Sequence, residues 1–312
     1  MTSITKQKSI NAGYLALGIT STVWGTTWVA SKYALQHLPA LQLAAIRQLI
    51  AGSCFLFYFL VVKKQNLPSL SDLKSMFIMS LLMMVFANGL STWGLKHIPT
   101  GLGSLIGALY PMSVWLIERF VYKKKVGNSF TIIGLILGVV GIGFVFYQNM
   151  FATVTKELIF GLVLSVFAML SWSLGTLFLS SHKLTVNPYH GMGWQMMMGT
   201  IMLSLLSWIT GEHIPIAEIN TEGWLSILYL AIFGSVMTFV AFIYSLNKLP
   251  ATISSLYAYF NPIVALWMAS WWLKEKLTSE LFIGALITLT GVYMVNHSIK
   301  KDREKLIVES EV

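Results

Sequence analysis

The amino-acid sequence predicts an all-α integral membrane protein of ten transmembrane helices, formed by two inverted five-helix repeats. Three observations predict this fold: the composition, a series of long apolar runs and a similarity between the two halves. Of the 312 residues, 56% are hydrophobic and only 11% are charged. A soluble domain carries about 25% charged residues because water must solvate its surface. Most of the surface of this chain must therefore face lipid.

Apolar runs long enough to cross a membrane recur along the whole chain. A bilayer core of about 30 Å requires about 20 apolar residues in a helix. The first run lacks the cleavage site of a signal peptide and further runs follow it, so we expect it to remain as the first span. The ten runs lie at residues 12–34, 40–62, 74–95, 100–122, 129–147, 158–181, 189–210, 222–245, 251–273 and 279–298.

Lys and Arg residues are divided unevenly between alternate loops. Clusters such as Lys63–Lys64 and Lys123–Lys125 fall on the side of the N-terminus, whereas the other side receives few basic residues, among them Lys96. Cytoplasmic loops of membrane proteins carry an excess of Lys and Arg. We therefore expect a multi-pass protein of the plasma (cytoplasmic) membrane with both termini in the cytoplasm. The charged tail over residues 299–312 is expected to leave the helix and to be solvated.

Several classes of partner and cofactor are disfavoured by the sequence. The net charge is +9, but the basic residues flank apolar runs instead of gathering on a soluble face, so we expect no nucleic-acid partner. The single cysteine, Cys54, excludes an intrachain disulfide and a Cys-based metal site. The six His residues are scattered, and no phosphate-binding motif occurs between a strand and a helix. We expect no metal and no cofactor.

The two halves of the chain resemble each other. The segment LKHIPTGLGSLIGALYPMSVW around Pro99 is matched 151 residues later by LNKLPATISSLYAYFNPIVALW, in which Pro250 and Pro262 take the places of Pro99 and Pro111. Trp24 aligns with Trp172 at an offset of 148 residues. Because each repeat holds an odd number of spans, the second must enter the membrane in the opposite orientation, with a binding site at the interface. The expected divisions are 1–11, 12–149, 156–298 and 299–312.

Several short motifs carry a family resemblance. WGTTWVASK (24–32), RQLIAG (47–52) and GALITLTGVYMV (284–295) resemble the drug/metabolite transporter superfamily, in particular its EamA-type permeases. The resemblance implies a ten-helix carrier of small metabolites, often an exporter of amino acids or related compounds. It also implies a cavity among spans 1, 3, 4, 6, 8 and 9, with spans 2 and 7 outside and spans 5 and 10 packed together. The chain departs from the pattern at Lys123–Lys125, where the second half has an acidic residue, Glu275.

Charged residues inside spans indicate function or a specific pairing, because such a charge costs about 2.5–3.5 kcal/mol at a helix centre. Ser104, Pro111 and Glu118 are seven residues apart and share one helix face. They form either a cavity wall or, for Glu118, a contact with the headgroups or with the following lysines. Arg47 either anchors a substrate carboxylate or makes a structural or headgroup contact, which the peripheral position of span two favours. Lys32 either attracts anionic substrates or marks the membrane interface.

Aromatic, amide and proline residues complete the predicted site. Rings near the cavity are expected to stack on an apolar substrate or to face a cation. Pro111 and Pro262 are expected to act as hinges, because proline removes a helix hydrogen bond. Gly134 and Gly138 permit close packing of span five, which we expect against span ten. The expected substrate-binding residues are Trp24, Lys32, Ser104, Tyr110, Trp115, Glu118, Trp172, Tyr244, Tyr259 and Asn261.

The function that these features favour is transport. We expect a secondary-active or facilitative carrier of a small-molecule substrate, in contact with membrane lipid, that exports amino acids or related compounds by alternating access. Glu118 offers a site for a proton as the coupling ion. A carrier of sugar-linked or lipid-linked substrates is the alternative within transport. A membrane-embedded transferase would need convergent acidic or His residues at one membrane face, which the sequence does not gather, so we do not expect an enzyme.

Overall fold

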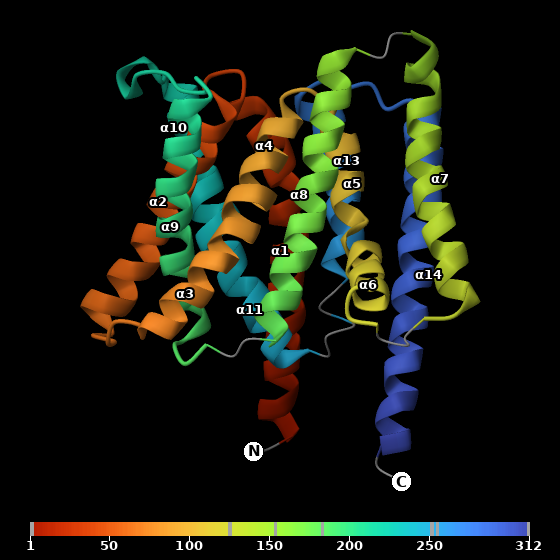
Figure 1. Ribbon diagram of the computed structural model, residues 1–312, viewed down its shortest axis with the longest axis horizontal. Coiled ribbons are helices and arrows are strands. Elements are labelled where there is room, and N and C mark those ends of the chain that lie inside the picture. The colour runs from red at the N-terminus through yellow and green to blue at the C-terminus, as the bar shows by residue number, and fades with distance from the viewer. Residues whose placement is uncertain are drawn as a thin grey trace.

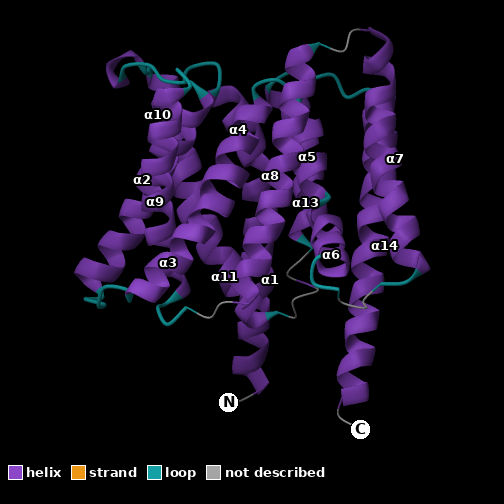
Figure 2. Cartoon of the chain, in the orientation of Figure 1, coloured by secondary structure: helices purple, strands orange, loops and turns teal. Residues whose placement is uncertain are grey.

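The computed structural model describes residues 3–123, 127–152, 155–181, 184–249, 253 and 256–310. These residues form helices and connecting loops with no strand among them, as Figure 2 shows. The helices run roughly side by side, and the two chain ends lie at the same side of the bundle (Figure 1). Pro250, Ser255, Lys124 and Lys125 lie outside the described residues, so the alignment of Pro99 with Pro250 stays a prediction.

The first half begins with the long helix α1. Pro39 and Pro99 each stand directly before a helix, where an extended residue without a backbone donor is tolerated. Ser69 Oγ accepts a hydrogen bond from the Asp72 amide at 3.1 Å and so caps α3. The elements are α1 (Ser3–Ala34), α2 (Ala40–Leu56), η1 (Phe57–Val62), α3 (Leu70–Met79), η2 (Ser80–Gly89), α4 (Leu90–Leu95), α5 (Thr100–Ala108), α6 (Tyr110–Phe120) and α7 (Ser129–Ala152).

The second half begins with the long helix α8. Asn187 and Asn220 cap α9 and α10, since their side-chain oxygens accept from the amides of Tyr189 at 2.9 Å and Gly223 at 2.8 Å. The elements are α8 (Lys156–Ser181), α9 (Pro188–Ile209), the 3₁₀ turn η3 (Ile216–Glu218), α10 (Thr221–Ala231), η4 (Ile232–Met237), α11 (Thr238–Lys248), α13 (Tyr257–Trp272) and α14 (Ser279–Ser310).

Long apolar helices make this a multi-pass integral membrane protein. Large apolar side chains such as Val139, Val163 and Phe282 are exposed on the outside of the bundle, where lipid would surround them. In the described residues, six helical segments are long and apolar enough to cross a membrane, and Ser129–Val145 is a shorter apolar helix. The six are Ala40–Val62, Leu70–Leu95, Thr100–Phe120, Lys156–Leu179, Thr221–Lys248 and Ser279–Lys301. The count of ten spans stays a prediction.

Helix packing brings the two halves together. α7 packs along α14, α2 along α9, and α5 against α13, while α1 contacts α11 and α13. The contact of α7 with α14 is close enough that a Cβ added to Gly134 would lie 2.7 Å from the Gly291 carbonyl oxygen. A Cβ added to Gly291 would lie 2.6 Å from the Gly138 backbone nitrogen, and a Cβ added to Gly138 itself would meet Met112 of α6. The expectation that span five packs against span ten is therefore confirmed.

The structure corrects two expectations about helix geometry. The tail does not leave the helix near residue 299, since α14 continues to Ser310. Pro111 and Pro262 are also not equivalent in shape: Pro111 lies in the first turn of a new helix, α6, after a break at Leu109, whereas Pro262 lies inside α13. A proline in a first turn removes no helix hydrogen bond, so the same residue type produces different local structure at the two places.

Three segments, η1, η2 and η4, have π-helical hydrogen bonding that the sequence did not predict. η2 and η4 occupy corresponding places, each between two α-helices of the third helical segment of its half. Ser235 Oγ donates to the Leu230 carbonyl at 3.1 Å, and Thr238 Oγ1 donates to the Phe233 carbonyl at 2.6 Å. Because each of these bonds spans five residues, hydroxyl side chains support the widened turns. π-Helical turns in α-helices are frequent at functional sites.

Candidate functional site: a central cavity

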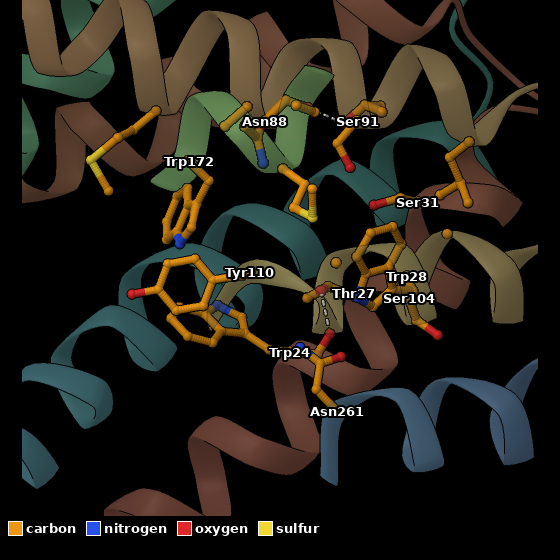
Figure 3. A pocket seen from close by; sticks show the side chains of 18 of the residues that line it. Trp24, Thr27, Trp28, Ser31, Asn88, Ser91, Ser104, Tyr110, Trp172 and Asn261 are labelled. Carbon is orange, nitrogen blue, oxygen red and sulfur yellow. Dashed lines mark hydrogen bonds between the residues drawn. The ribbon is translucent and has the colours of Figure 1, made fainter. Parts of the chain in front are cut away.

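A cavity of about 230 Å³ lies in the middle of the bundle, and helices of both halves line it (Figure 3). Its walls come from α1, α2, η2, α4, α5 and α6 in the first half, and from α8, α9, η4, α11 and α13 in the second. The lining residues that carry rings or polar groups are Trp24, Thr27, Trp28, Ser31, Arg47, Gln48, Asn88, Ser91, Thr92, Ser104, Tyr110, Ser165, Trp172, Ser235, Phe239, Tyr257 and Asn261.

Aromatic rings close one end of the cavity. The Trp24 ring centroid lies 5.5 Å from that of Phe239 and 5.1 Å from those of Phe242 and Tyr257. The Trp24 indole Nε1 donates a hydrogen bond to the Gly234 carbonyl of η4 at 3.2 Å, which fixes the plane of the ring. Trp24 lies two helical turns closer to the N-terminal end of α1 than Ser31, so this aromatic cluster closes the end of the cavity nearer the chain termini.

Polar side chains line the opposite end. Asn88 and Ser91 face the cavity from η2 and α4, across from Ser31 of α1 (Figure 3). Gln48 Nε2 donates to Asn88 Oδ1 at 3.3 Å and to the Met84 carbonyl at 3.2 Å, so the Asn88 amide is held by α2. Asn261 lies at the other end, beside Trp24 (Figure 3), and in the described part of the chain its buried Oδ1 has no hydrogen-bond partner. Since buried polar atoms are normally satisfied, Asn261 is a candidate contact for a bound molecule or water.

Glycines let the tryptophans approach the helices around the cavity. A Cβ added to Gly103 or Gly107 of α5 would lie 3.1 Å from the Trp28 ring, so both glycines leave room for that indole. A Cβ added to Gly25 of α1 would lie 2.5 Å from the Val264 Cβ of α13, beside Pro262. The close contacts of α1 with α5 and α13 therefore depend on these small residues.

Five of the ten predicted binding residues come together in the cavity wall. Trp24, Ser104, Tyr110, Trp172 and Asn261 line it, as does the predicted hinge Pro262. Figure 3 shows Trp24, Tyr110 and Trp172 on the same side of the cavity. The other predicted hinge, Pro111, is buried outside the lining. Their roles in binding and movement stay predictions.

Three further residues of the predicted binding set, Lys32, Trp115 and Glu118, lie outside the cavity lining. Lys32 Nζ donates to the carbonyls of Leu95 at 2.7 Å and Ile98 at 2.9 Å, which binds the end of α4 and the following turn. Trp115 packs in a cluster with Val292 and Val295 of α14. Glu118 is 3% exposed and lies outside the lining.

Tyr244 and Tyr259 also lie outside the cavity. Tyr259 OH is hydrogen-bonded to Asn296 Nδ2 at 2.5 Å, so its polar end faces α14. Tyr244 is on the outer side of α11 with its ring 5.8 Å from Lys248 Nζ. The predictions for Tyr244 and Tyr259 differ from their positions for a physical reason. The sequence places these residues in helices next to the cavity but does not specify which face of each helix turns inward.

Arg47 is the charged residue among the described residues that line the cavity. It is 9% exposed, its Nε donates to Ser235 Oγ at 2.9 Å, and its Nη2 lies 3.4 Å from the Gly234 carbonyl oxygen. The structure contradicts the interpretation that Arg47 contacts headgroups, since the side chain turns toward η4 of the other half. The layout implied by the resemblance, with span two outside, concealed its place in the cavity. Trp28, Gln48, Asn88 and Tyr257 are further lining residues that the predicted set lacked.

Glu275, which follows α13, caps a helix of the other half. Its carboxylate accepts hydrogen bonds from the Thr100 amide at 3.1 Å and from Thr100 Oγ1 at 2.6 Å. Thr100 is fully buried at the start of α5, where a negative charge also interacts favourably with the helix dipole. Its counterpart in the first half, Lys124, lies outside the described residues.

Replacing Glu275 by alanine is expected to lower the melting temperature of the detergent-solubilised protein by several degrees. The loss corresponds to about 0.5–2 kcal/mol, the usual contribution of a helix cap. Glu275→Gln should cost less, because the amide oxygen still accepts from Thr100. Thermal unfolding followed by intrinsic fluorescence measures both values, and an unchanged melting temperature for the alanine variant would contradict the capping role.

Comparisons with known proteins give the family. The model of the EamA-like transporter family matches residues 11–147 and again residues 159–297. The uncharacterized transporter YoaV of Bacillus subtilis is 31% identical over 281 residues, which cover 89% of this chain and 95% of YoaV. The uncharacterized inner membrane transporter YedA of Escherichia coli is 26% identical over 274 residues, which cover 88% of this chain and 87% of YedA.

A solved structure has the same fold. It superposes with a TM-score of 0.62 over 94% of this chain and 99% of its own, at 14% sequence identity, which shows the fold alone. The family resemblance seen in the sequence is confirmed by the two matches to one family model. The chain therefore belongs to the EamA-like transporter family of the drug/metabolite transporter superfamily, and it is a multi-pass membrane transporter.

Proposed function

We propose that this protein is a secondary-active or facilitative carrier that exports amino acids or related small metabolites by alternating access. The observation that supports this proposal most directly is the central cavity, which takes its walls from both halves of a chain whose halves match the same family model. A site at the interface of two repeats becomes accessible from either side when the halves rock around it. The cavity volume of about 230 Å³ suits a small metabolite.

The proposed inverted duplication of ten spans is supported by equivalent contacts in the two halves. Thr185 donates to the Asp72 carboxylate through its amide at 3.1 Å and through Oγ1 at 2.5 Å. Asn220 caps α10 as Ser69, 151 residues earlier, caps α3, and the Asn220 side-chain nitrogen lies 3.0 Å from Nδ1 of His37, which stands 148 residues before Thr185. α3 begins on the side of the chain termini and α10 on the opposite side (Figure 1), as an inverted pair requires.

Backbone geometry gives a second pair of equivalent positions in the two halves. Lys123 and Lys274, which are 151 residues apart, both have positive φ angles, of 54° and 57°. Each follows the end of the proline-containing helix of its half. A positive φ is uncommon for a residue with a side chain, so its recurrence at matching places supports duplication.

We propose that both termini are cytoplasmic and that the carrier resides in the plasma membrane. The basic loop clusters such as Lys63–Lys64 lie on the side of the N-terminus. The two chain ends lie on this same side of the bundle (Figure 1). With this orientation, the Trp24 cluster closes the cytoplasmic end of the cavity, and Asn88 and Ser91 line the end toward the outside.

In the proposed transport cycle, the closed end of the cavity opens and the opposite end closes. Trp24 and Tyr257 lie on α1 and α13, which contact each other, so movement of this pair away from α11 would open the aromatic cluster. Pro262 lies inside α13 between Asn261 and Val264, which both approach Gly25 of α1, and Pro111 follows the break between α5 and α6. We propose that these two places act as the hinges of the movement.

Uptake and efflux in proteoliposomes with a panel of labelled amino acids tests the proposed function. We expect saturable exchange of at least one amino acid by the purified protein and none in liposomes without it. If no member of the panel moves, the amino-acid proposal fails. The alternative, a carrier of sugar-linked or lipid-linked substrates, would require several cationic side chains for the phosphate groups, whereas Arg47 is the charged residue found among the described lining residues.

A proton is the coupling ion that we propose, with Glu118 as its carrier. Glu118 is 3% exposed and stands inside the apolar segment Thr100–Phe120. Replacing Glu118 by Gln should abolish the stimulation of transport by an imposed pH gradient and leave exchange at equal pH in place, because the amide cannot release a proton. Proteoliposome assays with and without the gradient measure this effect. Unchanged stimulation in Glu118→Gln would remove Glu118 as the carrier.

A further inference from the structure

Arg47 presents a positive charge to the cavity without a carboxylate to balance it. The ion pairs found in the described residues, His37 with Glu222 and Lys96 with Glu212, involve residues outside the cavity lining. Acidic side chains are absent from the described lining. Buried charges in proteins are normally paired, and a charge inside a membrane segment usually marks a substrate pathway. Arg47 therefore lacks the partner that its burial requires.

The contacts that Arg47 does make hold its guanidinium group and leave donors available. Nε is bound to Ser235 Oγ, and Nη2 lies near the Gly234 carbonyl, so both contacts are to η4. Neither involves Nη1. A guanidinium group carries five N–H donors in a rigid fork that matches the two oxygens of a carboxylate. The group is thus oriented by neutral partners and keeps donors for an anion.

The charge is present on one side of the proposed two-fold axis only. The residue 148 positions after Arg47 is Gln195, which is buried and neutral. A single cation in a cavity whose other walls are aromatic rings, methionines and neutral polar groups balances a single negative charge. Substrates with several phosphate charges would be left unbalanced in such a site.

We propose that Arg47 binds the carboxylate of the transported molecule, and that the cavity selects substrates that combine one carboxylate with an aromatic or other apolar body. The body would lie against Trp24, Tyr110 and Trp172, which face the cavity together (Figure 3). An amine without a carboxylate is disfavoured, because its charge would be repelled by the guanidinium in a site of low dielectric constant. This inference rests on the proposed transport function and names the class of its substrate.

Three probes with the same ring and different head groups test the inference: phenylacetate, phenylacetamide and phenethylamine. Their binding to the purified full-length protein in nanodiscs can be followed by quenching of tryptophan fluorescence and by calorimetry. We expect phenylacetate to bind at least about tenfold more tightly than the other two. Removal of one member of a buried charge pair weakens binding by that factor or more. Arg47→Gln should remove the preference, and Arg47→Lys should retain part of it.

Control variants distinguish the effect of the Arg47 charge on binding from general effects of a substitution. Arg119→Gln removes a positive charge from an exposed position of α6 and should leave the preference for phenylacetate intact. Ser235→Ala removes a partner of Nε but not the charge, so it should weaken phenylacetate binding without reversing the order of the probes. If Arg47→Gln does not fold, the comparison of the three head groups on the natural protein still decides the question.

Three results would overturn the inference: equal binding of phenylacetamide or phenethylamine, an intact preference in folded Arg47→Gln, or no binding of any probe. These results are distinct from failure of the proposed transport function. A protein that exchanges amino acids but ignores the head group of the probes contradicts the role of Arg47 alone. A protein that prefers phenylacetate but moves no substrate in proteoliposomes keeps the binding site and loses the transport proposal.

Discussion

Replacing Gly141 by alanine is expected to lower the melting temperature of the protein by several degrees or to prevent its assembly. A Cβ at this position would lie 2.6 Å from the Thr288 backbone nitrogen and 2.7 Å from the Gly284 carbonyl oxygen, so α7 and α14 would have to separate. Overpacking of this kind typically costs about 1–3 kcal/mol. The clash is with backbone atoms, which cannot move aside as a flexible side chain can.

The same helix supplies the matched control. A Cβ added to Gly143 meets nothing within 4 Å, so Gly143→Ala should leave the melting temperature unchanged or raise it, since alanine favours the helix by about 1 kcal/mol. Fluorescence-detected melting in detergent and the elution profile on size exclusion measure both variants. Equal behaviour of Gly141→Ala and Gly143→Ala would show that α7 and α14 are not packed as described.

Replacing Trp24 by alanine is expected to abolish transport while the protein still folds and inserts. The indole contacts Phe239, Phe242 and Tyr257 and donates to the Gly234 carbonyl, so its removal opens the closed end of the cavity and removes part of the binding surface. Truncation of a packed tryptophan also costs about 3–5 kcal/mol of folding stability, so the elution profile of the variant on size exclusion must show that it is folded. Initial rates of exchange in proteoliposomes measure the effect.

Two further variants make the Trp24 result specific. Trp24→Phe keeps an aromatic ring but loses the hydrogen bond to Gly234, so we expect a reduced rate, not a complete loss. Trp208 is 70% exposed on α9, outside the cavity lining, and Trp208→Ala should transport at the natural rate. A rate for Trp24→Ala equal to that of Trp208→Ala would exclude Trp24 from both closure and binding.

The sequence predicted helix positions well because apolar runs and proline boundaries determine them directly. The run 40–62 coincides with α2 and η1 together, and the run at 100–122 with α5 and α6. Faces of the helices were predicted less well. A lipid-facing helix is apolar on most of its circumference, so the pattern that marks the buried side of a soluble helix is weak. Trp115 and Tyr259 were assigned to the cavity for this reason, although both turn toward α14.

Arg47 shows a different limit of sequence reasoning. Its unusual position inside a span was clear from the sequence, but its orientation depends on Ser235 and Gly234, which lie 188 and 187 residues further along the chain. Both residues belong to η4, a π-helical segment in which the hydrogen bonding is shifted by one residue. A hydrophobicity pattern with a regular helical period does not contain this shift.

The aromatic cluster at one end of the cavity has a kinetic consequence under the proposed two-fold symmetry. At an offset of 151 residues, Phe239 and Phe242 correspond to Asn88 and Ser91, so the opposite end cannot close with the same aromatic contacts. The two resting conformations then differ in free energy, and the empty carrier populates one of them more than the other. The half-saturation concentration for substrate offered to one face of the membrane will therefore differ from that for the other face, even when no gradient is applied.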